Sequence, residues 1–487
     1  MPATTFADIW RGEYDDEETF RRFLVAYPEF ERTATLTHRR RINFPEIGRY
    51  LDWTGAAKYG LDQLDEHFGL LREQPYGNPH SDSNASMMST DAINEARRAV
   101  RLFLNASYEE YEVIFTSNAT TAIQLVGAGY PFKDRHFVYL QDNHNSVLGV
   151  AKFATKVGGT VARVPISQDD LRLPDGALRQ ELDLRKCSSG LFAFSAQSNF
   201  SGVQYPLELI GQAKRHGLDV LLDAAAFVPT NKLDLTFWQP DFVTLSLYKI
   251  IGYPTGIGCL VARKEALAKL TPPTFAGGTV LASSTQGPWH IDAEAPARFE
   301  AGTPNFLGLL GVSPTLGFIK RQIGGIHSRV MALTGWTLEQ LTQLRHDSGQ
   351  PMVHLYGPKD TQDRGATIAF NFRDYHGDVV DERTVSQAAN DAGICLRTGC
   401  FCNPGAGEAA FKLNAQKLWD LGHAEDAASM TAEERLRYLD MPSGGAVRIS
   451  FGNVSTFADA ETFLRFAIGF RNFIPRPEQK LPDRSHC

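Results

Sequence analysis

The stretch that decides the fold is Ser246-Leu247-Tyr248-Lys249-Ile250-Ile251-Gly252, which follows an apolar run at 241–245 that is typical of a buried strand. A lysine just beyond a strand of an open α/β sheet is held still and is partly removed from water. Such an amine can lose its proton and form an imine with a carbonyl group. Because most lysines are solvated surface groups, Lys249 by itself does not identify a site.

A second apolar run, at 218–222, lies upstream of the lysine and ends in Asp223. A carboxylate at a strand end can keep the pyridine nitrogen of a bound cofactor protonated. Enzymes that use pyridoxal 5′-phosphate (PLP) need this acid, followed further along the chain by a strand that ends in Ser-X-X-Lys. The order of Asp223, Ser246 and Lys249 therefore predicts a PLP site.

Hydrophobic patterning predicts an α/β fold, because strands and helices alternate from about residue 84 to 262 in the rhythm of a mostly parallel sheet covered by helices. Residues 265–305 are rich in Gly, Pro, Thr and Ser and predict extended loops, and a helix at 307–322 is expected to lead out of the large domain. We expect a large domain at 45–325 and a smaller α/β domain built from 1–44 and 326–487. The expected strands are 111–116, 136–140, 160–164, 191–195, 218–223, 242–246, 258–262, 367–372, 394–397 and 447–451, and the expected helices of the large domain are 84–104, 119–128 and 146–156.

Bulk composition indicates an ordinary globular protein. The 487 residues are 43% hydrophobic and carry a net charge of −7 without a basic stripe, so nucleic acid is not an expected partner. No apolar stretch is long enough to span a bilayer, and the acidic segment 1–18 does not resemble a signal peptide. The six scattered cysteines predict thiols and not a disulfide framework. We therefore expect a cytoplasmic protein.

Three further segments contain candidate ligands of the cofactor. The segment Thr116 to Ala122 lies at a strand-to-helix junction, where free amides suit a phosphate, although simple helix capping also explains it. His144 follows the strand at 136–140, and its imidazole could stack on a flat ring or be structural. Asn199 follows the strand at 191–195, either as a turn residue or as a donor to a cofactor oxygen.

The segment Cys400-Phe401-Cys402 is flanked by Gly399 and Pro404, which predicts a mobile loop. A structural zinc needs four ligands, and no second Cys or His pair of suitable spacing lies nearby, so we expect no metal. Arg397 would favour ionisation of a neighbouring thiol, which suits a nucleophile. Arg448 lies in an apolar strand, where it could bind a substrate carboxylate or an internal acid.

Taken together, these segments resemble the class V aminotransferase family of PLP enzymes and its cysteine desulfurase branch. Within that branch they are most similar to the N-terminal domain of molybdenum cofactor sulfurases. The likeness covers roughly residues 40 to 475 and implies the PLP-dependent transferase fold of type I. It is carried by Leu221-Leu222-Asp223-Ala224-Ala225-Ala226, Ser246-Leu247-Tyr248-Lys249 with Pro254-Thr255-Gly256, and Arg397-Thr398-Gly399-Cys400-Phe401-Cys402-Asn403-Pro404-Gly405.

The resemblance implies a role for each candidate. Lys249 binds the cofactor covalently and moves the Cα proton of the substrate, Asp223 pairs with the pyridine nitrogen and His144 stacks on the ring. Arg448 and Arg397 bind the substrate carboxylate, and Cys402 accepts sulfur to form a persulfide as alanine leaves. The remaining implied cofactor contacts are Asn199 to the phenolic oxygen and Ala119, Thr120 and Ser246 to the phosphate, together with Thr303 from the other subunit of a homodimer.

The chain departs from the family pattern at three positions. Ala226 replaces a glutamine of many desulfurases, Tyr248 replaces a histidine, and Gly407 replaces a cysteine that many of the sulfurases carry. Because the sequence stops at Cys487, we do not expect the C-terminal domain of the sulfurases, and the final sulfur acceptor, a protein or a small molecule, stays open.

We therefore expect an L-cysteine desulfurase, with an amino acid as its small-molecule substrate. The alternatives are another PLP-dependent carbon–sulfur lyase, a selenocysteine lyase, an amino acid epimerase or decarboxylase, and an idle PLP-fold scaffold. An idle domain has no physical need for Lys249, Asp223, His144 and Arg448 together.

Overall fold

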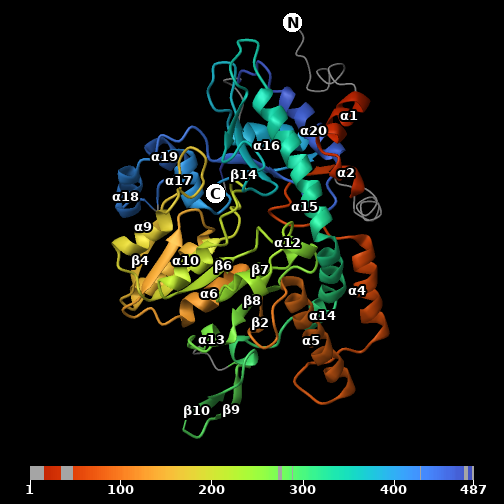
Figure 1. Cartoon of the computed structure of the whole chain (residues 1–487), viewed down its shortest axis with the longest axis vertical. Coiled ribbons are helices and arrows are strands. Elements are labelled where there is room, and N and C mark those ends of the chain that lie inside the picture. Colours follow the sequence, from red (N-terminus) through yellow and green to blue (C-terminus); the bar gives the residue numbers. More distant parts are fainter. Residues whose placement is uncertain are drawn as a thin grey trace.

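The computed structural model describes residues 16–33, 48–272, 277–287, 289–427, 429–475 and 481–484. Two main sheets organise these residues, and the helix α15, Val312–Gln343, runs from one toward the other (Figure 1). Cys487 and most of the expected N-terminal segment, at 1–15 and 34–47, lie outside the described residues.

The larger sheet has the strand order β2-β8-β7-β6-β5-β3-β4. Neighbours from β7 to β4 pair in parallel, whereas β8 runs antiparallel to both β7 and β2. The expected mostly parallel sheet is confirmed, and the continuous apolar runs arise because β5 and β7 are buried at every position. The strands are β2 Tyr111–Thr116, β3 His136–Leu140, β4 Thr160–Val164, β5 Gly190–Ser195, β6 Leu218–Asp223, β7 Phe242–Ser246 and β8 Gly258–Arg263.

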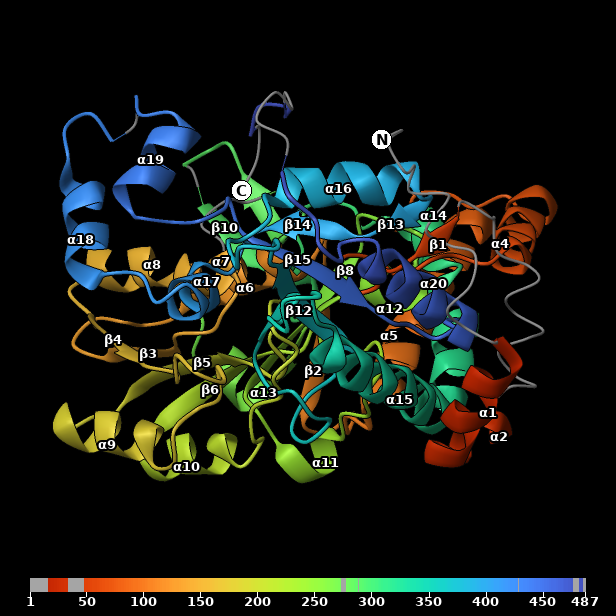
Figure 2. The ribbon, with the colours of Figure 1, turned by 90° about the horizontal axis from the view of Figure 1, so that it is seen from above.

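Helices cover both faces of this sheet (Figure 2). Successive strand residues alternate between two cores, so that Leu191 and Ala193 face one layer and Phe192 and Phe194 face the other. The first layer contains α6 Ala119–Gly129, α7 Asn145–Leu148 and α8 Val150–Lys156, and the second contains α9 Ala177–Leu184, α10 Leu209–Arg215 and α11 Leu235–Trp238. This three-layer arrangement places the loops after the parallel strands at one edge of the sheet.

The smaller sheet is antiparallel throughout, in the order β11-β12-β15-β14. The expected strand at 394–397 is two short strands, of which β13 pairs in parallel with β1 and brings residues 48–59 to this sheet. Helices α15, α16 and α20 pack beside it. The bounds are β1 Arg49–Tyr50, β11 Val353–Tyr356, β12 Thr367–Phe372, β13 Ile394–Cys395, β14 Arg397–Gly399, β15 Ala446–Ser450, α16 Glu382–Asp391 and α20 Phe457–Ile468.

The helix expected at 307–322 is α14, Phe306–Leu309, followed by α15, which continues to Gln343. Its second half contains poor helix formers, and burial overrides their propensity. The hydroxyl groups of Thr334 and Thr337 are buried and donate to backbone carbonyls one turn earlier, each at 2.7 Å. The domain boundary expected at residue 325 falls inside α15 and stays a prediction.

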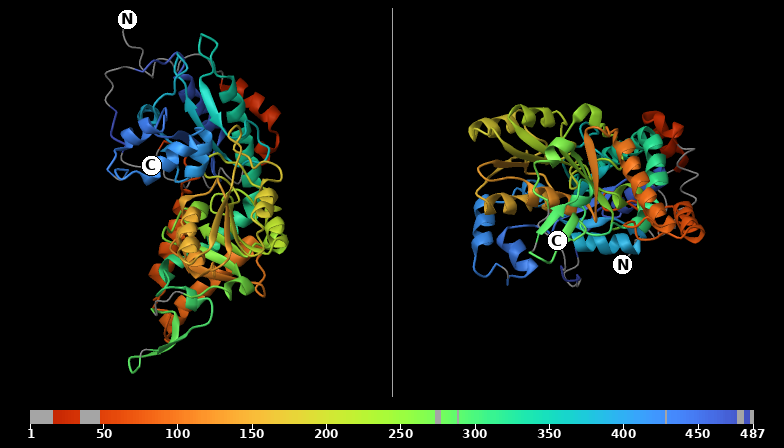
Figure 3. Two further views of the ribbon diagram at one scale, coloured as in Figure 1. Left: turned by 90° about the vertical axis from the view of Figure 1, so that its left-hand side faces the viewer. Right: turned by 90° about the horizontal axis from the view of Figure 1, so that it is seen from below.

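The expectation of extended loops at 265–305 is wrong in part. The antiparallel strands β9, Val280–Ser284, and β10, Trp289–Asp292, form a hairpin that projects from the body (Figures 1 and 3). Its glycine, serine and threonine content hid a short alternating pattern. Leu281, Trp289 and Ile291 on this hairpin are exposed.

The remaining helices frame these layers. Helix α5 packs against α15 and α14, and Phe23 of α1 contacts Trp336 of α15 and Phe457 of α20. Within the described ranges, no helix is both long and apolar enough to cross a bilayer. The bounds are α1 Asp16–Ala26, α2 Glu29–Arg32, α4 Leu61–Glu73, α5 Asn84–Leu104, α12 Tyr248–Ile251, α13 Lys264–Leu267, the 3₁₀ helix Ala297–Phe299, α17 Pro404–Ala410, α18 Ala415–His423 and α19 Ala432–Tyr438.

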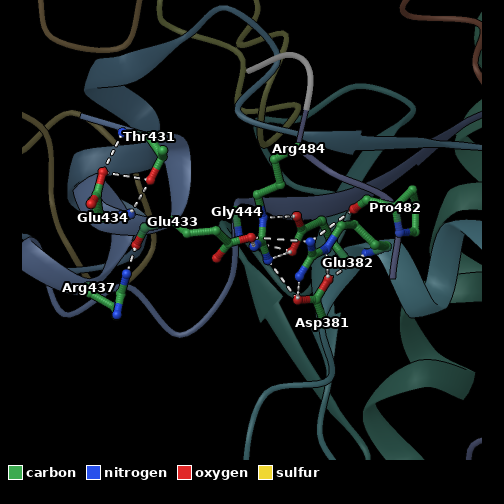
Figure 4. A network of polar contacts seen from close by, with 10 residues as sticks. Asp381, Glu382, Thr431, Glu433, Glu434, Arg437, Gly444, Pro482 and Arg484 are labelled. Atoms are coloured by element: carbon green, nitrogen blue, oxygen red, sulfur yellow. Dashed lines mark hydrogen bonds and ion pairs between the residues drawn. The ribbon is translucent and has the colours of Figure 1, made fainter. Parts of the chain in front are cut away.

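A cluster of ion pairs joins residues 481–484 to the smaller sheet (Figure 4). Arg484 binds Asp381 at 2.7 Å and Glu382 at 2.9 Å, both at the start of α16, and it also pairs with Glu433 of α19. Glu382 in turn accepts a hydrogen bond from the backbone of Gly444, just before β15, at 2.9 Å. The cluster therefore connects segments from four parts of the C-terminal sequence.

Candidate active site

Lys249 lies on the short helix α12, three residues beyond the end of β7. Its side chain is half-buried, and its Nζ has no hydrogen bond or ion pair with any residue that the structure describes. Burial lowers the pKa of Lys249, and Asp223 opposes this shift. Arg448 and Arg397 add to the lowering of the pKa. The amine is therefore more readily deprotonated than that of a surface lysine.

Asp223 ends β6, the strand beside β7, and is 8% exposed. Its Oδ1 accepts hydrogen bonds from the backbone of Ala225 at 3.0 Å and from the Thr244 hydroxyl at 3.5 Å. Its Oδ2 has no hydrogen-bond partner in the described part of the chain. One carboxylate oxygen is thus held by the protein and the other is available to a ligand.

His144 caps α7 after the end of β3. Its Nδ1 accepts from the backbone N–H of Ser146 at 3.2 Å, which assigns the ring proton of the neutral imidazole to Nε2. Burial lowers the pKa of His144, Asp223 raises it, and Lys249 lowers it. The three residues therefore influence one another at the carboxyl edge of the parallel strands.

The start of α6 joins this group through hydroxyl contacts. The backbone N–H of Ala119 donates to the Ser246 hydroxyl at 2.9 Å, and the Thr120 and Ser146 hydroxyls lie 2.7 Å apart. Ala119, Thr120 and Ser246 are thus brought together as expected for a phosphate site. Ser146 also belongs to the group, and its place after a strand, two residues beyond His144, is the signal that the sequence offered.

Thr303 is not brought to this cluster within the chain. It lines a separate hollow of about 640 Å³ with Ser117, Thr121 and Gly256. A contact of Thr303 with the cofactor of another subunit stays a prediction.

Arg397 and Arg448 are neighbours across β14 and β15, and both bind the same carboxylate. Arg448 Nη2 lies 2.8 Å from Asp52 Oδ1, and Arg397 Nε lies 2.8 Å from Asp52 Oδ2. Arg448 is buried, and its Nη1 also donates to the Asn199 carbonyl oxygen at 2.8 Å. Of the two interpretations of Arg448, the internal ion pair is present in the structure.

The cysteine segment is a tight turn and not the mobile loop that its glycine and proline neighbours suggest. Asn403 N donates to the Cys400 carbonyl oxygen at 3.1 Å, and both central residues, Phe401 and Cys402, have left-handed φ angles of 56° and 54°. Left-handed backbone at two successive non-glycine residues is strained, and such strain is found at functional sites. Cys402 is exposed, and Cys400 is half-buried.

Five contacts hold this turn against the site. Asn145 N donates to the Cys402 carbonyl oxygen at 2.8 Å, and Asn199 Nδ2 donates to the Phe401 carbonyl oxygen at 2.7 Å. The Phe401 ring lies 4.5 Å from the Arg448 guanidinium carbon. The Asn403 amide nitrogen donates to the buried Asp142 at 2.6 Å and to Asn199 Oδ1 at 2.9 Å. The Asn199 side chain is therefore engaged with the turn.

Two site acids were missed by sequence reasoning. Asp142 is fully buried, and burial raises its pKa, while hydrogen bonds from Tyr205, Asn403 and Ser198 lower it. Asp52 had no evident role, because its two arginine partners are 345 and 396 residues away in sequence. The position of Asp142, two residues after β3, was the only local signal.

Other cysteines differ sharply from Cys402. Cys259 is completely buried in β8, and burial raises its pKa to about 12. Burial also raises the pKa of Cys187. Since the thiolate is the nucleophile, neither thiol is suited to attack a substrate near neutral pH.

Comparison with known proteins identifies the class. The sequence profile of the aminotransferase class V family matches residues 49–463, so the chain belongs to this family. Membership implies PLP as the cofactor. The fold is shared with solved cysteine desulfurases: that of Thermococcus onnurineus NA1 superposes with a TM-score of 0.73 at 24% identity, covering 88% of this chain and 97% of that one. CsdA of Escherichia coli gives 0.70 at 23% identity, covering 89% and 97%.

The chain is also similar in sequence to a more specific group of proteins, the molybdenum cofactor sulfurases. The chain is 36% identical to the molybdenum cofactor sulfurase of Bos taurus over 461 residues, covering 88% of this chain and 51% of that protein. It is 35% identical to that of Solanum lycopersicum, covering 93% and 59%. The chain thus spans about half to three fifths of the length of these relatives.

Proposed function

We propose that this protein is a PLP-dependent cysteine desulfurase, which converts L-cysteine to L-alanine and leaves a persulfide on Cys402. The observation that carries the proposal is the position of the cysteine turn. Phe401 packs on Arg448, while the Cys402 carbonyl is bonded to Asn145, the residue after His144. The turn that carries the Cys402 thiol is thereby in contact with the proposed carboxylate-binding arginine and with the residue next to the proposed ring-stacking histidine. The similarity to molybdenum cofactor sulfurases supports the same chemistry.

The residues at the strand ends fit PLP. Among the residues that the structure describes, the Lys249 amine and one Asp223 carboxylate oxygen have no protein partner, and His144 provides a neutral ring. Ala119, Thr120 and Ser246 surround the start of α6, where a phosphate is stabilised by free amides and the helix dipole. When bound, PLP supplies an electron sink that stabilises negative charge at the substrate Cα. The Asn199 side chain is bonded to Phe401 and Asn403, so its proposed contact with the phenolic oxygen requires the amide to leave the Phe401 carbonyl.

The protein residues then divide the work on the substrate. Arg448 and Arg397 bind the α-carboxylate, and Lys249, whose pKa is lowered, removes the Cα proton as a general base. Cys402 Sγ, as a thiolate, attacks the substrate sulfur, so that an S–S bond forms while the Cβ–S bond breaks. The electron pair of the broken bond stays on carbon, where protons complete L-alanine. The balanced result is one persulfide and one alanine from one cysteine.

We also propose a homodimer in which Thr303 completes the phosphate site of the other subunit. This role is supported by the hollow that Thr303 lines, which includes Ser117 and Thr121 beside the start of α6 but not Lys249 or Ser246. The persulfide sulfur then passes to an acceptor protein or small molecule. The expected cytoplasmic location belongs to the same proposal.

The test is incubation of the purified PLP-loaded protein with L-cysteine, following alanine and sulfide with and without a reductant. Alanine is expected under both conditions, and sulfide mainly with the reductant, which releases it from the persulfide. Mass spectrometry under non-reducing conditions should locate the added sulfur on Cys402. Cys402→Ala should lose the persulfide and most alanine release while keeping PLP, and Cys400→Ala is the matched control. Alanine release at the parent rate by both variants would exclude the persulfide mechanism.

A further inference from the structure

The carboxylate of Asp52 lies between the two guanidinium groups that we propose for substrate binding. Its two oxygens are divided between them, with Oδ1 on Arg448 Nη2 and Oδ2 on Arg397 Nε, each at 2.8 Å. Asp52 is 8% exposed, so this arrangement is shielded from solvent and from screening by salt. Asp52 is held in place by its bridge to Ser450 of β15.

The two arginines keep donors for a further anion. The Arg448 Nε is buried and has no hydrogen-bond partner in the described part of the chain. A buried donor without a partner is costly and calls for an explanation, and a bound anion would supply the acceptor that Arg448 Nε lacks. The side chain of Arg397 is half-exposed at 51%, and among the described residues its terminal nitrogens have no partner.

The net charge of this group of side chains determines which ligands it can accept. Two guanidinium groups contribute two positive charges, and Asp52 removes one, so the cluster of Arg397, Arg448 and Asp52 retains one positive charge toward a ligand carboxylate. We propose that Asp52 thereby determines specificity, because it restricts the site to amino acids with a single carboxylate. This inference rests on the proposed function, since it takes Arg448 and Arg397 as the substrate-binding groups. It adds that a dicarboxylic amino acid is rejected by charge.

Removing the charge of Asp52 at constant shape tests this proposal. The dissociation constants of L-alanine and L-aspartate are measured by calorimetry on the PLP-loaded protein. L-Aspartate carries a second carboxylate on the carbon where cysteine carries sulfur. Asp52→Asn is expected to shift the ratio of the two constants toward aspartate by about tenfold or more, because an uncompensated guanidinium then faces the ligand. The exposed Asp169→Asn changes net charge equally and should leave the ratio unchanged.

Variants that neutralise one or both charges distinguish a role of Asp52 in specificity from a purely structural role. Arg397→Gln leaves the site with no net charge, and L-alanine is expected to bind about tenfold more weakly or worse. The double variant Asp52→Asn/Arg397→Gln regains one positive charge and should recover alanine binding, which a purely structural role of Asp52 would not produce. An unchanged ratio in Asp52→Asn overturns the proposal. If that variant does not fold, unchanged alanine binding by Arg397→Gln overturns it.

The outcome is distinguishable from failure of the proposed function. Neither L-alanine nor L-aspartate contains sulfur, so both constants are independent of persulfide formation. A protein that releases no alanine from cysteine but shows the expected shift would refute the desulfurase proposal and retain the role of Asp52. Normal turnover of cysteine with an unchanged ratio would do the opposite.

Discussion

Lys249 is the residue whose chemistry depends most on its surroundings. Its lowered pKa means that the unprotonated fraction at any pH below 10.5 exceeds that of a free lysine side chain. We therefore predict that PLP-free protein captures PLP with a half-maximal rate below pH 10.5, measured by absorbance against Nα-acetyllysine as the reference. Asp223 raises this pKa and Arg397 lowers it, so Asp223→Asn should move the midpoint down and Arg397→Gln should move it up. A midpoint at or above pH 10.5 would contradict the assignment.

Cys402 combines an exposed thiol with a strained backbone, and the strain can be measured without any assay of activity. At a φ of 54°, glycine avoids a steric cost of about 1–2 kcal/mol that other residues bear. Cys402→Gly should therefore be more stable than Cys402→Ala by about 1 kcal/mol in urea unfolding. At Cys400, which has no positive φ, the order should reverse, with the glycine variant less stable by about 0.5–1 kcal/mol. The same order at both positions would rule out the turn.

Residues of the site could be predicted wherever a local pattern placed them after a strand. Lys249, Asp223, His144 and Ser246 follow apolar runs, and the parallel sheet brings such positions together. Asp52 could not be found in this way, because its role depends on partners more than 300 residues distant. For the same reason, the internal pairing of Arg448 could not be distinguished from substrate binding.

Helices and strands could likewise be predicted only where a local sequence pattern indicates them. The strands of the larger sheet were predictable almost to the residue because their sequences are largely apolar, and β5 and β7 are buried at every position, whereas nothing local reveals that β8 runs antiparallel. The hairpin β9–β10 was missed because its composition resembles a loop. The turn at Cys400–Asn403 was also unpredictable, since its conformation is imposed by tertiary contacts at Asn145, Asn199 and Asp142.

Asn403 lies between the cysteine turn and α17, and the turn depends on its contacts. It caps α17 through a hydrogen bond from Ala406 N at 3.1 Å, and its amide also satisfies Asp142 and Asn199. Asn403→Ala should cost about 1–3 kcal/mol, because a buried carboxylate loses a donor. We predict faster hydrogen exchange at 400–406 and a lower kcat for alanine release at nearly unchanged KM.

The matched control for this prediction is Asn414→Ala. Asn414 caps α18 in the same way, because its side chain accepts a hydrogen bond from Gln416 N at 2.8 Å. Unlike Asn403, Asn414 is exposed and forms no hydrogen bond with Asp142. Asn414→Ala should lower the free energy of unfolding by about 1 kcal/mol and leave hydrogen exchange at the cysteine turn unaltered. Equal effects of the two substitutions on the turn would show that capping alone explains Asn403.

The candidate site lies between the two sheets and takes residues from both. Lys249, Asp223 and His144 come from the larger sheet, whereas Arg397, Arg448 and the cysteine turn come from the smaller one and the segments beside it. Asn199 and Asn145, in segments that follow strands of the larger sheet, make contacts between these groups, with Arg448 and with the cysteine turn. Relative movement of the two sheets would therefore alter both carboxylate binding and the position of the thiol.

The proposed dimer extends this sharing to a second chain. Thr303 lines a hollow whose lining does not include Lys249, Asp223 or His144, so each site is expected to take this hydroxyl from the partner subunit. Lys249→Ala and Thr303→Ala proteins, each inactive or impaired, are mixed after mild denaturation and refolding. Half of the dimers should be hybrids, and each hybrid has one site with both an intact lysine and an intact threonine, so about a quarter of the parent sites should return. Activity in the mixture no greater than the sum of the two separate proteins, or full parent activity in a sedimenting monomer, would show that each chain works alone.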